Sequence, residues 1–270
     1  MTKIFFNFFT LVLISFGCSR NLYQDLATSD PDGYLLIQAQ AAINSLNYTN
    51  AIQILTVQVS APSQAKTNFK QTLATAYAGQ CGLNFANFIS GLASASSGTA
   101  FRLVMTPFVG VASTPASCLL GLNTMDAIGP AAVRTANQNA FVSVLGMALI
   151  GTQTRASADT SPVNGDGVVD VNLCNISDSD TNNIILGFGF MSKNFSYLST
   201  QQLGASSQTA ISNIISQCAA FAGATCSMTD PAQITASTRR AMLSILNTAE
   251  YGLGTVVTNG NPVLINGACP

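Results

Sequence analysis

The stretch LATAYAGQCGLNFANFISGL, residues 73–92, decides the fold of this chain. Apolar residues recur before QCG at the spacing of one helix face, and a second segment with the same periodicity follows it. Small residues on both segments let two antiparallel helices approach closely, and larger apolar residues fill the space beside them. The stretch therefore predicts a helix, a tight turn and a second helix.

The same pattern occurs once earlier in the chain. In QAQAAINSLNYTNAIQIL, residues 38–55, Ala39 and Ala51 hold the positions that Ala74 and Ala86 hold 35 residues later. Both stretches resemble the tetratricopeptide repeat, whose units are helical hairpins that stack on one another. Two generic amphipathic hairpins are the alternative, and they are helical as well. The resemblance implies helix-packing roles for Ala39, Tyr48, Ala51, Leu73, Ala74, Tyr77, Leu83 and Ala86.

Beyond the hairpins, the chain is predicted to be all-α. We expect a single domain at residues 34–270, with the two tetratricopeptide-like hairpins at 34–95 and later helices that complete and cap the array, because such hairpins are stable only when stacked. Residues 155–177 are rich in Ser, Thr, Asp, Asn and Gly, which predicts one long loop. The segment VVTNGNPVLI, residues 256–265, is typical of a short hairpin or an extended tail.

Residues 1–17 have the features of an export signal. Lys3 precedes a short apolar run that ends in a small residue, and Cys18 follows directly. This arrangement resembles a bacterial lipoprotein signal, which implies cleavage before Cys18, a lipid on that cysteine and a polar tether at residues 18–33. Ser19, at a position where inner-membrane retention would favour Asp, points to the outer membrane. An ordinary secretory signal is the alternative.

The composition excludes several functional classes. Charged residues make up 8% of the chain and the formal net charge is −1, so the chain carries no basic surface for nucleic acid. It has no histidine, which excludes Ser-His and Cys-His nucleophile pairs and His-ligated metal sites. Since no other nucleophile motif is present, we do not expect an enzyme. Ser, Thr, Asn and Gln must cover most of the surface.

Six cysteines remain if Cys18 carries lipid, and an even number in an exported chain predicts up to three disulfides. Six cysteines allow 15 pairings, so the connectivity stays open. Cys218 and Cys226 are close enough in sequence to close a small loop at a helix end. Buried free thiols are the alternative. The candidates are Cys81, Cys118, Cys174, Cys218, Cys226 and Cys269.

One short stretch has the composition of a metal site. In VNGDGVVD, residues 163–170, Asn164, Asp166 and Asp170 provide oxygens at even spacings, and the Val168 carbonyl would face the same point. Such ligands suit Ca²⁺. The stretch resembles the calcium loop of dockerin and EF-hand proteins, although Leu173 replaces the closing acidic ligand of that family. A solvated turn is the alternative. A calcium site would need further ligands, and the nearest are Asp159, Asp178 and Asp180.

Two functional hypotheses follow. The first is a lipid-anchored periplasmic or surface module that binds another exported protein. It is similar in architecture to the tetratricopeptide lipoproteins that partner the substrate-binding proteins of TRAP-type transporters. The alternative is a carrier of a lipid or small hydrophobic ligand in a cavity between helices. A dry apolar pocket would favour the carrier over the interaction module.

Overall fold

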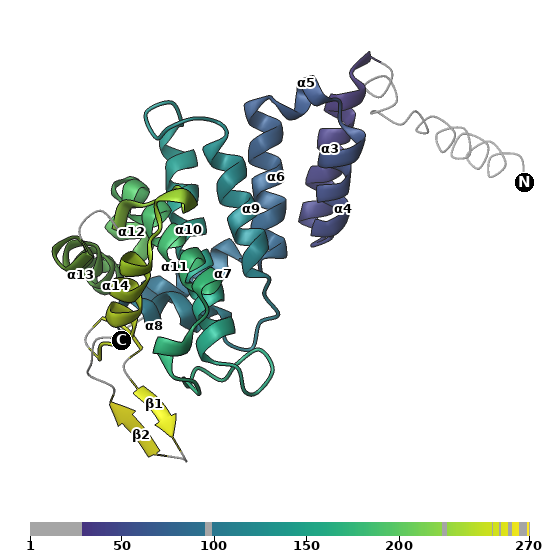
Figure 1. Ribbon diagram of the computed structural model, residues 1–270. Coiled ribbons are helices and arrows are strands. Elements are labelled where there is room, and N and C mark those ends of the chain that lie inside the picture. Colours follow the sequence, from purple (N-terminus) through teal and green to yellow (C-terminus); the bar gives the residue numbers. More distant parts are fainter. Residues whose placement is uncertain are drawn as a thin grey trace, which may run out of the picture.

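Helices account for nearly all of the regular structure in the computed structural model (Figure 1). The structure describes residues 29–94, 99–222, 226–249, 251–253, 255–258, 261–264 and 269. The predicted signal, the predicted lipid site at Cys18 and most of the tether lie outside these ranges. The prediction of an all-α fold is confirmed. No helix among the described residues is both long and apolar enough to cross a membrane.

The elements follow one another in this order: α3 (Pro31–Asn44), α4 (Tyr48–Gln53), the π-helical turn η1 (Ile54–Gln58), α5 (Ala61–Gln64), α6 (Thr67–Gln80), α7 (Phe85–Ser94), α8 (Ala100–Met105), η2 (Thr106–Phe108), α9 (Pro115–Asp126), α10 (Ala136–Ala158), η3 (Leu173–Asn175), α11 (Asp178–Asn194), η4 (Phe195–Tyr197), α12 (Thr200–Leu203), α13 (Ala205–Ala222), η6 (Pro231–Gln233), α14 (Ala236–Leu246), β1 (Thr255–Thr258) and β2 (Asn261–Leu264).

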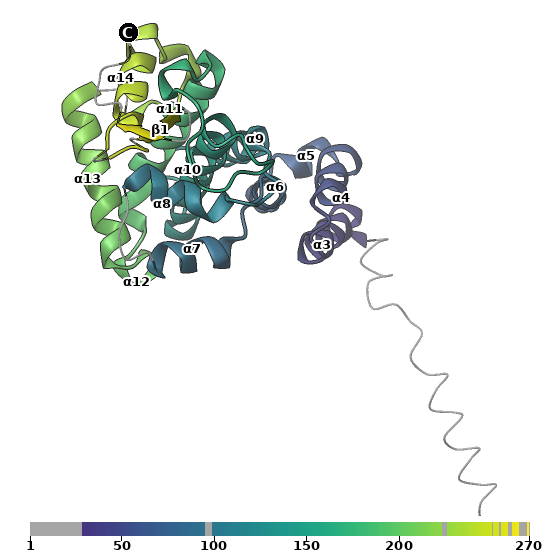
Figure 2. The same ribbon diagram turned by 90° about the horizontal axis from the view of Figure 1, so that it is seen from below.

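The helices are arranged as neighbouring layers. α3 packs on α4 and η1, and this pair covers one side of α6. α6 packs on α9, α9 on α10, and α10 on α11 and α8, while α13 and α14 lie at the far end. Figure 1 and Figure 2 both place α3 and α4 at one end of the molecule and α13 at the other. The polypeptide therefore builds a stack of helices that ends in an exposed pair, α3 and α4.

The second helical pair is formed by α6 and α9. Cys81, directly after α6, is disulfide-bonded to Cys118 in the first turns of α9. At the other end of the pair, the Lys70 Nζ donates a hydrogen bond of 2.7 Å to the Ala127 carbonyl oxygen. The two helices are thus antiparallel, and α7 and α8 are inserted between them in the sequence.

This arrangement corrects the repeat prediction. Both predicted helix pairs exist as helices, but α7 packs against α12 and α13 instead of completing a hairpin with α6. Ala86 is exposed, so its predicted packing role is wrong. The physical reason is that α7 buries Phe88 and Leu92 in the larger core, which is separate from the small core shared by α3, α4 and α6. The small residue that faces α6 is Gly121 of α9, where an added Cβ would lie 3.3 Å from the Ala74 carbonyl oxygen.

The other predicted packing residues lie in or beside the core. Ala39 and Ala51 are fully buried between α3, α4 and α6, and Ala74 and Leu83 are buried in the larger core. Leu73, Tyr48 and Tyr77 are partly buried. The first pair, α3 with α4, therefore packs through alanines as expected.

The central helix, α10, is buried on nearly all sides. It approaches α11 so closely that a Cβ at Gly146 would lie 2.7 Å from the Gly187 carbonyl oxygen. It also runs further than the sequence predicts, since it ends at Ala158 and the predicted loop begins only at residue 159. The polar side chains of this last part find partners in different places, and that of Thr152 bonds to the helix itself. The Thr152 hydroxyl donates a 2.7 Å bond to the Ala148 carbonyl oxygen.

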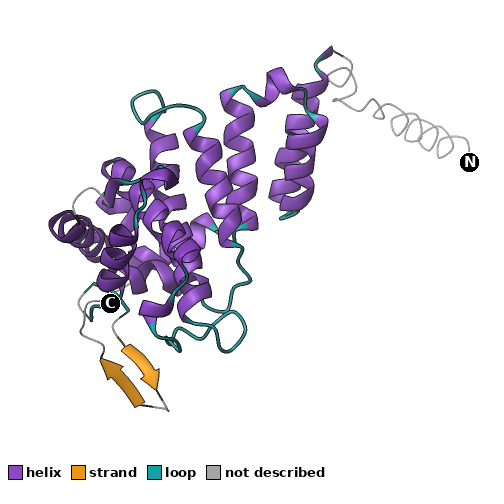
Figure 3. Ribbon diagram, viewed as in Figure 1, coloured by secondary structure: helices purple, strands orange, loops and turns teal. Residues whose placement is uncertain are grey.

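All six candidate cysteines form disulfides: Cys81–Cys118, Cys174–Cys269 and Cys218–Cys226. The prediction for the last pair is confirmed, and the first two are long-range links that no spacing could predict. Of the two alternatives for the C-terminal segment, a hairpin or an extended tail, the hairpin forms. Its strands β1 and β2 pair antiparallel, with Val256 opposite Val263 (Figure 3).

Candidate functional site

Two grooves flank helix α3 at the exposed end of the stack. The α3–α6 groove has a volume of about 380 Å³, and the α3–α4 groove about 470 Å³. Both are within the size range of ligand sites, about 300–1,000 Å³. The α3–α6 groove is lined by Gln40, Ile43, Asn44, Asn68, Gln71, Thr72 and Thr75. The α3–α4 groove is lined by Gln38, Ala41, Ala42, Ser45, Asn47, Asn50, Ile54 and Gln58.

The lining of the α3–α6 groove is polar and uncharged. Side-chain amides and hydroxyls dominate it, and Ile43 is its one apolar member. Among the described residues, the amides of Gln40, Asn44 and Asn68 have no hydrogen-bond partner, whereas the Gln71 Oε1 accepts a bond of 3.1 Å from the Gln138 Nε2. Each free amide offers both donors and an acceptor. The groove can therefore pair with the N–H and C=O groups of an extended peptide.

Helix α3 is held in place by a carboxylate. The Asp32 Oδ1 accepts a bond of 3.0 Å from the Ser60 backbone N–H, and its Oδ2 accepts a bond from the Ser60 hydroxyl. These bonds, the hydroxyl first, hold the pKa of the Asp32 carboxyl below its usual value. The start of α3 is thereby tied to the end of η1, so the edge of both grooves is fixed.

Sequence reasoning did not single out the amides of this groove. Gln40 and Asn44 are four residues apart on α3, as are Gln71 and Thr75 on α6, so each pair lies on one helix face. That spacing of uncharged polar residues on two neighbouring helices was the available signal. It becomes informative only once the two helices are known to lie side by side.

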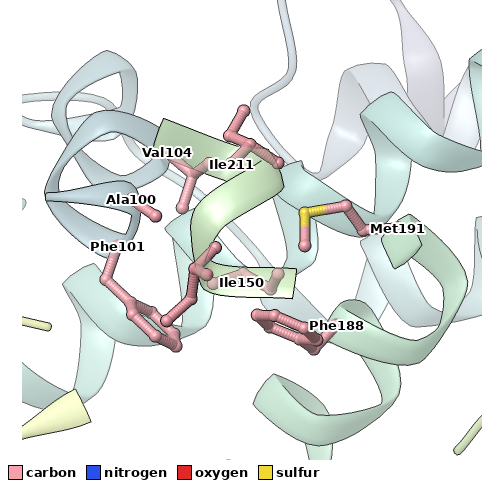
Figure 4. A pocket seen from close by; sticks show the side chains of 8 residues that line it. Ala100, Phe101, Val104, Ile150, Phe188, Met191 and Ile211 are labelled. Carbon is pink, nitrogen blue, oxygen red and sulfur yellow. The ribbon is translucent and has the colours of Figure 1, made fainter. Parts of the chain in front are cut away.

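The apolar cavity in the core is small. It lies among α8, α10, α11 and α13, and its side chains point toward one another (Figure 4). Its volume is about 10 Å³, which is room for about one water molecule. Ligand pockets are larger by a factor of about thirty or more. The lining is entirely apolar: Ala100, Phe101, Val104, Ile150, Phe188, Met191, Ile211 and Ile214.

The predicted calcium ligands lie in a loop that is held by hydrogen bonds within the protein. Asn164 has a φ of 70°, and its carbonyl accepts a bond of 2.8 Å from the Gly110 N–H. One oxygen of Asp166 accepts from the Val168 N–H at 2.9 Å. Both oxygens of Asp170 accept bonds from Thr160, and one of them also from the Ser161 N–H.

The loop is organised by a different carboxylate. Asp159 is fully buried and accepts bonds from the backbone N–H groups of Asp166, at 3.0 Å, and of Gly167, at 2.8 Å. Of the further ligand candidates, Asp178 pairs with Arg239 and Asp180 accepts from the Gln153 amide. Across the described ranges, no group of three or more acidic or cysteine side chains is placed to hold a metal ion.

Comparison of this chain with protein-family models, with curated proteins and with solved structures finds no match. The geometry of the site is therefore the basis for a function.

Proposed function

We propose that this chain is an exported, lipid-anchored module that binds an extended, uncharged segment of another exported protein in the α3–α6 groove. The observation that carries the proposal is the row of free side-chain amides along that groove. A peptide backbone offers one donor and one acceptor per residue, and an amide side chain matches both. The lining contains no charged and no aromatic side chain, which disfavours charged ligands and sugars that stack on rings.

The position of the groove also supports this proposal. It lies between α6 and the end helix α3, and Gln40, Asn44 and Asn68 in its lining are exposed, so a partner can reach it (Figure 1). The tetratricopeptide lipoproteins that partner TRAP-type substrate-binding proteins are an analogy of architecture only.

The test is site-specific photo-crosslinking in intact cells. A photo-crosslinking amino acid replaces Asn44 in the groove or, as a control, the exposed Gln233 on the far helices. We expect one protein to be captured from position 44 and not from position 233. The purified partner should then bind about tenfold more weakly to the Gln40→Ala, Asn44→Ala double variant, since two hydrogen-bonding groups are lost. Equal capture at both positions, or unchanged affinity, would contradict the proposal.

The lipid anchor has its own experiment. If Cys18 carries lipid, the natural chain should lie in the outer-membrane fraction and take up a fatty-acid analogue, and Cys18→Ser should take up none. A natural chain that takes up no label would contradict the anchor and leave the groove proposal intact.

The carrier hypothesis has weaker support. The apolar cavity would have to expand from about 10 Å³ to at least about 300 Å³. Native mass spectrometry of the purified protein tests it, because a carrier should retain a lipid or a hydrophobic small molecule.

The calcium site of residues 164–170 stays a prediction. A thermal melt in calcium and in chelator tests it, since a ligand that binds only the folded form raises the apparent stability. A calcium shift that disappears in Asp166→Ala would support a metal site. Identical melting in the two conditions would leave the segment as a hydrogen-bonded loop.

A further inference from the structure

Arg155 is a buried cation without an acidic partner. It lies in the last turn of α10 and is only 7% exposed. Its Nη2 donates a bond of 2.7 Å to the Ser113 hydroxyl, and its buried Nε has no partner. Neither of the two ion pairs among the described residues includes it. Burying a charge is costly unless that charge is paired and hydrogen-bonded.

A second buried arginine, Arg134, has more partners, although its Nη1 has an ion pair and no hydrogen bond. Arg134 is also 7% exposed. It makes an ion pair with Asp126 and donates to the side-chain oxygens of Asn139, at 2.9 Å, and Asn194, at 3.2 Å. Burial lowers the pKa of Arg134, and the charge of Asp126 opposes that shift. Arg155 is equally buried but has one neutral acceptor where Arg134 has three oxygens, one of them charged.

The surroundings of Arg155 add further positive potential. Ser113 lies directly before Thr114, the residue that precedes the 12-residue helix α9. The Thr114 side chain makes no capping bond, and the first turn of α9 holds no acidic residue. The N-terminal end of a helix carries a partial positive charge and unpaired N–H groups. The C-terminal end of α10 favours a cation at Arg155, but it provides no acceptor for the Nε.

The nearest carboxylate along the helix is not available to Arg155. Asp159 is one turn further on, and its two oxygens accept the N–H groups of Asp166 and Gly167. The described residues therefore place a guanidinium and a helix N-terminus on either side of Ser113, and none of their carboxylates is paired with either.

We infer that Arg155, Ser113 and the start of α9 form a binding site for a small oxyanion, a carboxylate or a phosphate. A guanidinium presents paired N–H donors in a fixed fork that fits two oxygens of such a group. Ser113 is only partly buried, so an anion can enter from the loop between η2 and α9. This inference uses other residues than the α3–α6 groove and does not depend on the proposed function.

The direct test is a titration of the full-length ¹⁵N-labelled protein in detergent, read at the arginine Nε–H resonances. Sodium phosphate and sodium acetate are added in separate arms, each against sodium chloride at equal ionic strength. We expect the Arg155 Nε–H signal to shift saturably in one or both arms, and the stronger arm identifies the oxyanion class. Failure of that signal to move beyond the chloride control in both arms overturns the inference.

Variants then separate the site from general charge effects. The apparent anion affinity should fall about tenfold or more in Arg155→Gln, because charged hydrogen bonds are lost. The affinity should be unchanged in Arg240→Gln. This control removes the same charge from an exposed position. If Arg155→Gln does not fold, Arg155→Lys keeps the charge and assigns the Arg155 Nε–H resonance by its disappearance. The titration of the unaltered chain then still tests whether the anion binds. Equal affinity in Arg155→Gln and the unaltered chain contradicts the inference.

Discussion

The N-terminal layer, residues 31–64 with the outer face of α6, and the body, α7 to β2, are stabilised in different ways. In the layer, half of the buried apolar residues are alanines, and residues 31–64 contain no cysteine. The body has a far larger apolar core, and two of the three disulfides lie within it while the third fastens α6 to it. Stability is thus concentrated in the body, and the layer is free to present polar side chains.

Helix α6 joins the two regions. Phe69 and Ala76 on one side of α6 belong to the small core, and Ala74 and Ala78 on the other side belong to the large one. Perturbations of the layer should therefore reach the body only through α6.

The largest effect is expected from removing the Cys174–Cys269 disulfide. The two cysteines are 95 residues apart, and closing a loop of that length in the unfolded chain is worth about 5 kcal/mol in the chain-entropy model. The Cys174→Ser, Cys269→Ser variant should therefore lose that much unfolding free energy, as measured by denaturant titration. The short Cys218–Cys226 link, 8 residues apart, serves as the control and should cost about half as much when removed. Equal losses would mean that loop length does not set the stability of the body.

The next largest loss of unfolding free energy is expected at Gly151, and Gly79 provides the comparison. A Cβ on Gly151 in α10 would lie 2.0 Å from the Val104 backbone carbonyl oxygen, so α8 and α10 must separate. Gly151→Ala should cost about 3 kcal/mol. A Cβ on Gly79 in α6 would instead meet the ring of the partly buried Tyr48, which can rotate away.

Gly79→Ala should therefore cost less than about 1 kcal/mol, because the better helix propensity of alanine offsets part of the clash. Chemical unfolding of both variants checks the contrast. If Gly79→Ala is as damaging as Gly151→Ala, the layer is packed as rigidly as the body and the comparison fails.

The sequence predicted the elements better than their arrangement. Helical periodicity, the short Cys218–Cys226 spacing and the turn residues of the C-terminal hairpin are local signals, and all three predictions are confirmed. The choice of α9 over α7 as the partner of α6 is a competition between distant segments. It is decided by Phe88 and Leu92, which the larger core buries, and no local pattern contains that information.

The candidate site was predicted only in its general nature. The shortage of charges indicated a surface of amides and hydroxyls, but the groove forms between helices α3 and α6, which are separated in the sequence by α4 and α5. Arg155 was assigned to a loop because its neighbours are polar. In the structure they lie in a buried helix, so a buried cation became visible only there.

A smaller loss of stability is expected at acidic pH, and it should affect the N-terminal layer first. The folded pKa of Asp32 lies below its unfolded value, so its bonds to Ser60 contribute stability above the unfolded pKa. That contribution is lost as the pH falls below about 4. The melting temperatures of the natural chain and of Asp32→Asn should differ at pH 7 and converge in this acidic range. A difference that persists at low pH would show that the carboxylate charge is not what ties α3 to η1.

The smallest effect on stability is expected in the groove, although this is where binding should change most. Asn44 and Asn68 are exposed, and their side chains have no partner among the described residues. Asn44→Ala and Asn68→Ala should each change the unfolding free energy by no more than about 0.5 kcal/mol. Chemical unfolding checks this, and each variant is then compared with the natural chain in partner binding. A large loss of stability would mean that these amides support the layer itself. Weaker binding at unchanged stability would mean that the layer carries recognition and the body carries the fold.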